Sequence, residues 1–230
     1  MTVNKSARIL WIVAITAMAL TAAMMIIGGI GTVCAAFLTE NFPPLLPIVD
    51  YQWFYQRMVF IGIAIGIAGM SVTFGLFRGG PHAYRNALIV LLIGTVQHEL
   101  RVRASLELRG KMAPANIVFY MNLFTLVLFL ILGLPSIRGG ISFSKPRGKK
   151  EAAAAGGMAA LIVGLMLLTL PLWVGSSHTY EGTDWTDVLQ PGLSIVGLAF
   201  AVGGLGVFLK AAVTVIRQPE PAILTNEARP

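Results

Sequence analysis

The sequence predicts an all-α polytopic integral membrane protein with six transmembrane helices, arranged as three antiparallel hairpins. Three observations lead to this prediction. Hydrophobic residues make up 56% of the 230 residues and charged residues only 12%, against roughly 25% charged residues in soluble domains. The apolar residues form runs long enough to cross a bilayer, for which about 20 residues suffice. The basic residues gather in short loops between these runs, which is the pattern that sets orientation in a membrane.

Six apolar runs are separated by segments rich in proline, glycine or charge. The first run is much longer than the apolar part of a signal peptide, so we interpret it as a retained first span. The chain therefore divides into a six-span bundle over residues 1–217 and a polar, Pro-containing tail over 218–230, which has the composition of a disordered end. The predicted spans lie within 9–38, 58–77, 82–109, 115–134, 152–174 and 192–215.

The third span is unusual because it becomes ionic at residues 97–103. Its apolar part covers only about 15 Å at 1.5 Å per residue, against a hydrocarbon core of about 30 Å. If the span crosses, 12 of the 17 Lys and Arg residues lie on the side of the N-terminus, whereas without it they divide 9 against 8. Orientation follows this bias. We therefore expect the span to cross a plasma membrane, both termini to be cytoplasmic, and loops 39–56, 110–114 and 175–190 to be outside.

This crossing would carry polar and ionisable groups into the outer half of the membrane. Such groups normally face protein or a wet cavity and are functional candidates. If the third and fourth spans turn near Met112, Arg101 lies level with Asn122 and His98 level with Thr125. The predicted intramembrane polar cluster comprises His98, Glu99, Arg101, Arg103, Asn122 and Thr125.

Arg101 needs a partner outside its own helix. Glu99 is two residues away and points in nearly the opposite direction, but it can reach Arg103 one turn further on. We expect Arg101 to find Asn122, an acidic group of the 175–190 loop, a lipid phosphate or another subunit. The competing interpretation, which the sequence alone favours, is a helix end that leaves the membrane early, with its charges solvated or held by a neighbouring chain.

Small residues and aromatic residues predict two further kinds of contact. Glycines in the second and sixth spans predict faces on which another helix approaches closely. The aromatic residues before the second span suit the headgroup level of a membrane better than a ligand site. The predicted packing residues are Gly62, Gly66, Gly197, Gly203 and Gly204, and the predicted interface belt is Tyr51, Trp53, Phe54 and Tyr55.

No residue pattern predicts catalysis, a metal or a cofactor. His82 and His98 would lie about 24 Å apart on one helix, and the single Cys34 cannot form an intrachain disulfide. His178, Glu181 and Asp184 have cation-binding atoms, but a solvated acidic loop is the favoured interpretation. The formal net charge of +7 reflects the basic loops, so we expect no nucleic-acid partner.

Two hypotheses for function follow. We expect a non-catalytic integral membrane subunit, with the lipid bilayer and other membrane subunits or copies of itself as partners. The alternative is a transporter or channel protomer whose polar pathway uses His98, Glu99, Arg101 and Asn122. The near absence of ionisable groups in the other spans favours the first, as does the lack of predicted broken helices near the midplane. An enzyme acting on lipid is a third and weaker hypothesis.

Overall fold

The computed structural model describes residues 5–112, 115–138, 141, 143, 148–174, 179–180 and 182–217. This part of the chain is helical apart from loops and one pair of two-residue antiparallel strands. Five helical segments within it are long and apolar enough to cross a membrane, as expected of a multi-pass membrane protein.

The elements follow the predicted runs, with short additional helices between them. In chain order they are α1 (Lys5–Ile30), α2 (Val33–Phe37), the 3₁₀ helices η1 (Thr39–Asn41) and η2 (Pro43–Tyr51), α3 (Gln52–Arg78), α4 (Ala83–Arg109), α5 (Ala115–Leu132), α6 (Pro135–Arg138), α7 (Lys149–Leu168), α8 (Leu170–Val174), β1 (Thr179–Tyr180), β2 (Thr183–Asp184) and α9 (Trp185–Arg217).

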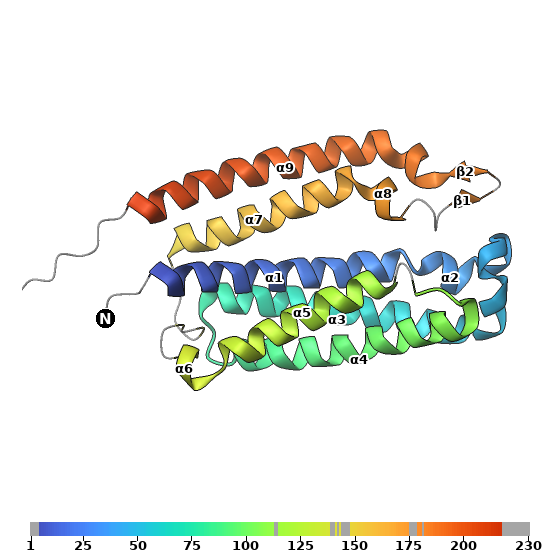
Figure 1. The fold of residues 1–230 in the computed structure, drawn as a ribbon, viewed down its shortest axis with the longest axis horizontal. Coiled ribbons are helices and arrows are strands. Elements are labelled where there is room, and N and C mark those ends of the chain that lie inside the picture. Colours follow the sequence, from blue (N-terminus) through green and yellow to red (C-terminus); the bar gives the residue numbers. More distant parts are fainter. Residues whose placement is uncertain are drawn as a thin grey trace, which may run out of the picture.

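The long helices form two groups that meet at α1 (Figure 1). Helices α1, α3, α4 and α5 make a four-helix bundle, and α7 packs on the other side of α1 and carries α9. The first turn of α1 and the last turn of α9 lie at the same end of the molecule, together with α6. We call this the terminal end. The opposite end, which we call the loop end, holds α2, η2 and the two strands.

Large apolar side chains fill the bundle toward its terminal end. Trp11, Leu91 and Phe129 are fully buried and belong to one continuous core cluster. Tyr84 stacks on Phe129, with ring centroids 6.0 Å apart, and its hydroxyl donates a hydrogen bond to the Phe129 carbonyl at 2.7 Å. This half of the four-helix bundle is therefore closed by packed aromatic and aliphatic groups.

Glycines end both the second and the third predicted spans, which are α3 and α4. Gly79 and Gly110 follow α3 and α4 with φ angles of 68° and 67°, a left-handed conformation that glycine adopts without steric cost. The amide of Gly80 donates to the carbonyl of Gly75 at 2.9 Å, which closes the end of α3. These ends agree with the sequence prediction.

Helix boundaries differ from the prediction at the 39–56 segment and at the start of α9. The 39–56 segment was expected to be a loop, but from Pro43 onward it is the 3₁₀ helix η2 and the first turn of α3, because proline is tolerated where the amide has no helical partner. Helix α9 begins at Trp185 and contains Pro191. Its start is fixed by Asp184, whose carboxylate accepts the amide of Thr186 at 2.9 Å, a capping interaction.

Small residues bring α7 and α9 into backbone contact. A Cβ added at Gly157 would lie 2.6 Å from the amide nitrogen of Phe208 and 2.8 Å from the carbonyl of Gly204, and one at Gly197 would lie 3.0 Å from the Gly164 carbonyl. Gly203 makes no such contact within the described chain, because nothing lies within 4 Å of its Cβ position, so its predicted packing role is left to a neighbouring helix. The helix turns that residue outward while its neighbour Gly204 faces α7.

The glycines of α3 contact two different helices. A Cβ at Gly66 would lie 2.6 Å from Cγ1 of Ile26 in α1, so this position sets the close approach of α1 and α3. Gly62 faces α4 instead, where a Cβ would lie 3.5 Å from the side-chain nitrogen of Gln97. The predicted pair therefore does not form one packing face against one partner.

We expect Gly157→Ala to lower the stability of the purified chain by about 1–3 kcal/mol, because its methyl group would force the backbones of α7 and α9 apart. Gly156→Ala is the matched control, since nothing lies within 4 Å of that Cβ position. Thermal unfolding in detergent measures both. Equal midpoints for the two variants would contradict the backbone contact.

Candidate functional site

The inward face of α4 changes from apolar to polar along its length. Residues at helical spacing on this face are buried: first Leu91 and Gly94, then His98, Arg101 and Ser105. Side chains three and four residues apart share one face of a helix, so the polar groups of the second half point into the bundle. His98 is 1% exposed and Arg101 is 6% exposed.

Glu99 and Arg103 lie on the outer side of the same helix. Their side chains are 42% and 71% exposed and form an ion pair, with Oε1 and Nη2 2.7 Å apart. Glu99 thus finds the partner that its spacing predicts. The expectation that both residues share one cluster with His98 and Asn122 is wrong, because α4 turns them away from the interior.

The inner part of the site joins α1, α4 and α5. The hydroxyls of Thr21 and Thr125 lie 2.7 Å apart. Thr125 donates its own proton to the Met121 carbonyl at 2.9 Å, so Thr21 is the donor of the pair. The Thr95 hydroxyl lies 3.4 Å from the side-chain oxygen of Asn122, although the Leu91 carbonyl at 2.8 Å is the nearer acceptor for its single proton. Asn122 is therefore level with Thr95.

Gly94 makes room for Asn122. The amide nitrogen of Asn122 occupies the position that a Cβ at Gly94 would need. This nitrogen is fully buried and has no hydrogen-bond partner among the described residues. The predicted pairing of Arg101 with Asn122 is therefore wrong, because Asn122 lies beside Thr95, nearly two turns of α4 before Arg101.

Arg101 instead reaches the interruption between α1 and α2. Its Nη2 donates to the hydroxyl of Thr32, which in turn donates to the Gly28 carbonyl at 2.6 Å. Residues 31–32 form a turn rather than helix. The other two guanidinium nitrogens, Nε and Nη1, are buried and have no acceptor among the described residues. Among the described residues, the observed partner of Arg101 is thus Thr32 and not Asn122, while Glu181 of the 175–190 segment lies outside the described residues.

Two more buried polar groups lie near Arg101. His98 and Tyr55 both lie within electrostatic range of its guanidinium. Neither ring nitrogen of His98 nor the hydroxyl of Tyr55 has a hydrogen-bond partner in the described part of the chain. We call Arg101, Tyr55, His98 and Thr32 the loop-end cluster.

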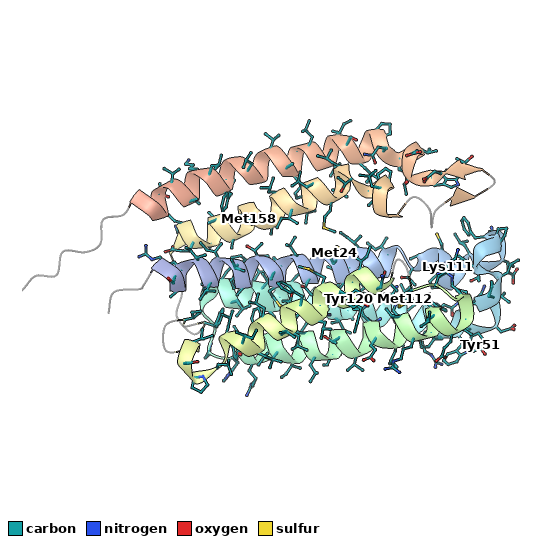
Figure 2. All side chains as sticks on the ribbon, in the orientation of Figure 1. Met24, Tyr51, Lys111, Met112, Tyr120 and Met158 are labelled. Atoms are coloured by element: carbon teal, nitrogen blue, oxygen red, sulfur yellow. The ribbon has the colours of Figure 1, made fainter. Side chains whose placement is uncertain are left out.

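Tyr55 does not belong to the predicted interface belt. Its ring is buried with Ile48 and Val59 beneath η2, because the first turn of α3 rotates it inward. Tyr51 and Trp53 are exposed, Phe54 is half-buried, and Figure 2 shows Tyr51 at the loop end.

Three residues of the site were not predicted from the sequence: Thr32, Tyr55 and Gln97. Gln97 is buried and donates to the Met58 carbonyl at 3.2 Å, and its place next to His98 could have indicated a role. Thr32 follows three closely spaced glycines, Gly28, Gly29 and Gly31, and these were the only signal for a helix interruption. Tyr55 lies seven residues before Gly62 on the buried face of α3, and this helical spacing could have indicated its inward direction.

The chemistry of the loop-end cluster is that of hydrogen-bond donation. In the described part of the chain, no group of three or more His, Cys, Asp or Glu side chains is placed to hold a metal ion. His178 and Glu181 lie outside the described residues, as does the 218–230 tail.

No protein-family model, curated protein or solved structure matches this chain, so function is inferred from its own contacts and charges.

The hydrogen bond between Thr21 and Thr125 gives a test of the inner part of the site. We expect a double-mutant cycle of Thr21→Val and Thr125→Val to show a coupling of about 0.6 kcal/mol, the usual value between membrane helices. Thr73→Val with Thr125→Val is the control, since Thr73 donates only to Gly69 of its own helix. Unfolding titrations in mixed micelles measure the coupling. A Thr21–Thr125 coupling no larger than that of the control would contradict the bond.

Proposed function

We propose that this protein is a non-catalytic integral membrane subunit that packs within a larger membrane protein assembly through the outer face of α7 and α9. The observation that carries the proposal is an apolar groove of about 380 Å³ between these helices. Its lining includes Gly156 and Ala160 of α7 and Ala199, Gly203 and Val207 of α9.

Packing within the chain does not explain the outward glycines of this groove. A Cβ at Gly156 or Gly203 would meet open space, so neither glycine is needed for the contact between α7 and α9. Glycine in a helix interior costs about 1 kcal/mol relative to alanine. Small residues on a membrane-facing surface let the backbone of another helix approach closely. The occupant that fits is an apolar transmembrane helix of a neighbouring subunit.

The position of α9 in the molecule agrees with this role. It packs on α7 and not on the four-helix bundle, and its outer side carries exposed apolar residues such as Ile195, Leu198 and Val202. Figure 2 shows side chains projecting outward along its length. A neighbouring chain can therefore reach the groove without displacing any part of the bundle.

We also propose six spans, α4 included, with both termini on the cytoplasmic side of the plasma membrane. Helix α4 lies alongside α3 and α5 (Figure 1). The basic residues expected inside, such as Arg8, Arg78 and Lys149, belong to helix turns at the terminal end, whereas Arg109 and Lys111 belong to the loop end. The positive-inside bias therefore favours the terminal end as cytoplasmic.

A transporter or channel protomer is the second candidate, and the interruption of α1 beside Arg101 favours it, since interrupted helices line ion and substrate sites in transporters. Thr16 and Thr73 are buried nearer the terminal end, but they donate to backbone carbonyls. The linked polar side chains of the described residues, however, extend only from the loop end to Thr21 and Thr125. Beyond them, Trp11 and Phe129 are fully buried in the apolar core. A continuous polar pathway would have to displace this core, so the subunit proposal is preferred.

Cysteine labelling in intact cells tests the topology. In a Cys34→Ser background we expect Met112→Cys to react with an impermeant maleimide, and His82→Cys and Lys149→Cys to react only after permeabilisation. Met112 and His82 lie beyond opposite ends of α4 and both are exposed. Equal labelling of these two positions would mean that α4 does not cross the membrane.

The assembly proposal predicts different effects for two outward glycines of α9. We expect Gly203→Leu to leave thermal stability unchanged but to reduce the complex extracted from native membranes to a single chain, because leucine would fill the groove. Gly206→Leu is the control, since its Cβ position is also open but it does not line the groove.

Native mass spectrometry of the extracted protein measures this outcome. A mass equal to a multiple of this chain would identify the neighbour as a second copy, and any other mass would identify a different subunit. Wild-type protein that is extracted as a single chain, or a Gly203→Leu variant that keeps its full complex, would overturn the proposal. Ion or solute flux in vesicles containing this chain alone would favour the second candidate.

A further inference from the structure

We infer that the loop end of the four-helix bundle contains an oxyanion-binding site in which Arg101, Tyr55 and His98 hold a phosphate group. This site goes beyond the proposed function, because packing through α7 and α9 does not involve it. The inference rests on hydrogen-bond donors that the chain leaves unpaired, on the local charge, and on the position of these groups in the molecule.

The cluster has more donors than acceptors. Arg101 uses Nη2 to reach the Thr32 hydroxyl, while its Nε and Nη1 have no acceptor in the described part of the chain. The Tyr55 hydroxyl and both ring nitrogens of His98 are also without partners there. A buried polar group left unpaired costs about 1–3 kcal/mol, and more if it is charged. An oxyanion supplies several acceptors in one small group.

The charge of the cluster selects an anion. The ion pairs formed among the described residues are Arg8–Glu151 and Arg103–Glu99, so no described carboxylate lies within 4 Å of Arg101. Arg109 adds a second positive charge within electrostatic range of Tyr55. A buried guanidinium without a counter-charge is strongly unfavourable. A phosphate oxyanion removes this penalty, whereas a cation or an apolar ligand would not.

The cluster lies at the end of the molecule where two sources of phosphate are available. Thr32 lies at the interruption between α1 and α2, and Tyr55 lies in the first turn of α3 beside Ile48 of η2. Figure 2 places Tyr51, Lys111 and Met112 at this same end. In the proposed topology this end is at the outer membrane surface, where either a phospholipid headgroup or free phosphate can approach.

The experiment measures phosphate binding by the purified full-length chain in a neutral detergent. Inorganic phosphate and phosphatidic acid are the two probes, and diacylglycerol is the lipid control because it lacks only the phosphate. We expect at least one probe to raise the unfolding temperature in a saturable way. Binding of phosphatidic acid alone would identify a lipid as the source, and binding of both would identify a site open to free phosphate.

Substitutions locate the site. We expect Arg101→Gln to weaken phosphate binding about tenfold, the effect of losing one charge-assisted hydrogen bond. Arg103→Gln is the matched control: it removes the same charge from the same helix, but on its outer face, and should weaken binding no more than about twofold. Tyr55→Phe, which removes one oxygen, should weaken binding about threefold.

Two results would overturn the inference. One is the absence of any saturable stabilisation of the wild-type protein by either probe. The other is binding by Arg101→Gln that equals binding by Arg103→Gln. Should Arg101→Gln fail to fold, as circular dichroism would show, the Tyr55→Phe variant decides: unchanged binding in that variant overturns the site. None of these results depends on whether α7 and α9 bind a neighbouring subunit.

Discussion

The burial of the Arg101 guanidinium is the constraint on which the arrangement of the four-helix bundle depends. A charge at the centre of a membrane helix costs about 2.5–3.5 kcal/mol on insertion scales, so the protein has to surround it. Three segments do so: the end of α1 at Thr32, the first turn of α3 at Tyr55, and η2 above them. In the proposed six-span topology, α4 without this enclosure would expose a guanidinium and an imidazole directly to lipid.

The two faces of α4 meet the cost of charge by different means. On the outer face Glu99 and Arg103 neutralise each other one turn apart, and such a pair is stabilising by only a few tenths of a kcal/mol. Its main effect is to remove net charge from the lipid-facing side. On the inner face Arg101 has no such partner, and its charge remains uncompensated by the described residues. The inner face therefore has a charge that the proposed phosphate ligand would neutralise, whereas the charges of the outer face neutralise each other.

The sequence predicted the helices well because their signals are local. Runs of apolar residues and the glycines at 79 and 110 are enough to locate α3 and α4. The orientation of α4 about its axis was also present in the sequence, although unused: the small residues Ala83, Ala87 and Gly94 continue the buried face of Arg101, whereas the large residues Leu92 and Val96, which precede Glu99 on its face, are exposed. A small-residue stripe shows which side faces a neighbouring helix.

The partners within the site could not be predicted from the sequence. Thr32 reaches Arg101, 69 positions away, because the helix is interrupted at residues 31–32. Tyr55 lies on the buried face of α3, but its place near Arg101 depends on the packing of α3 against α4. Both relations arise from contacts between different helices. The predicted level of Asn122 failed for a related reason. It assumed a symmetric turn between α4 and α5, whereas close packing at Gly94 sets the register.

The loop-end cluster and the groove between α7 and α9 lie in different parts of the molecule. The loop-end cluster lies within the four-helix bundle. Helices α7 and α9, which form the groove, lie on the far side of α1 (Figure 1). A helix that met only lipid would gain about 1 kcal/mol from alanine at positions such as 156 and 203. The glycines at both positions face the same groove. Their cost is offset only if another backbone packs closely against them, which is what an assembly partner provides.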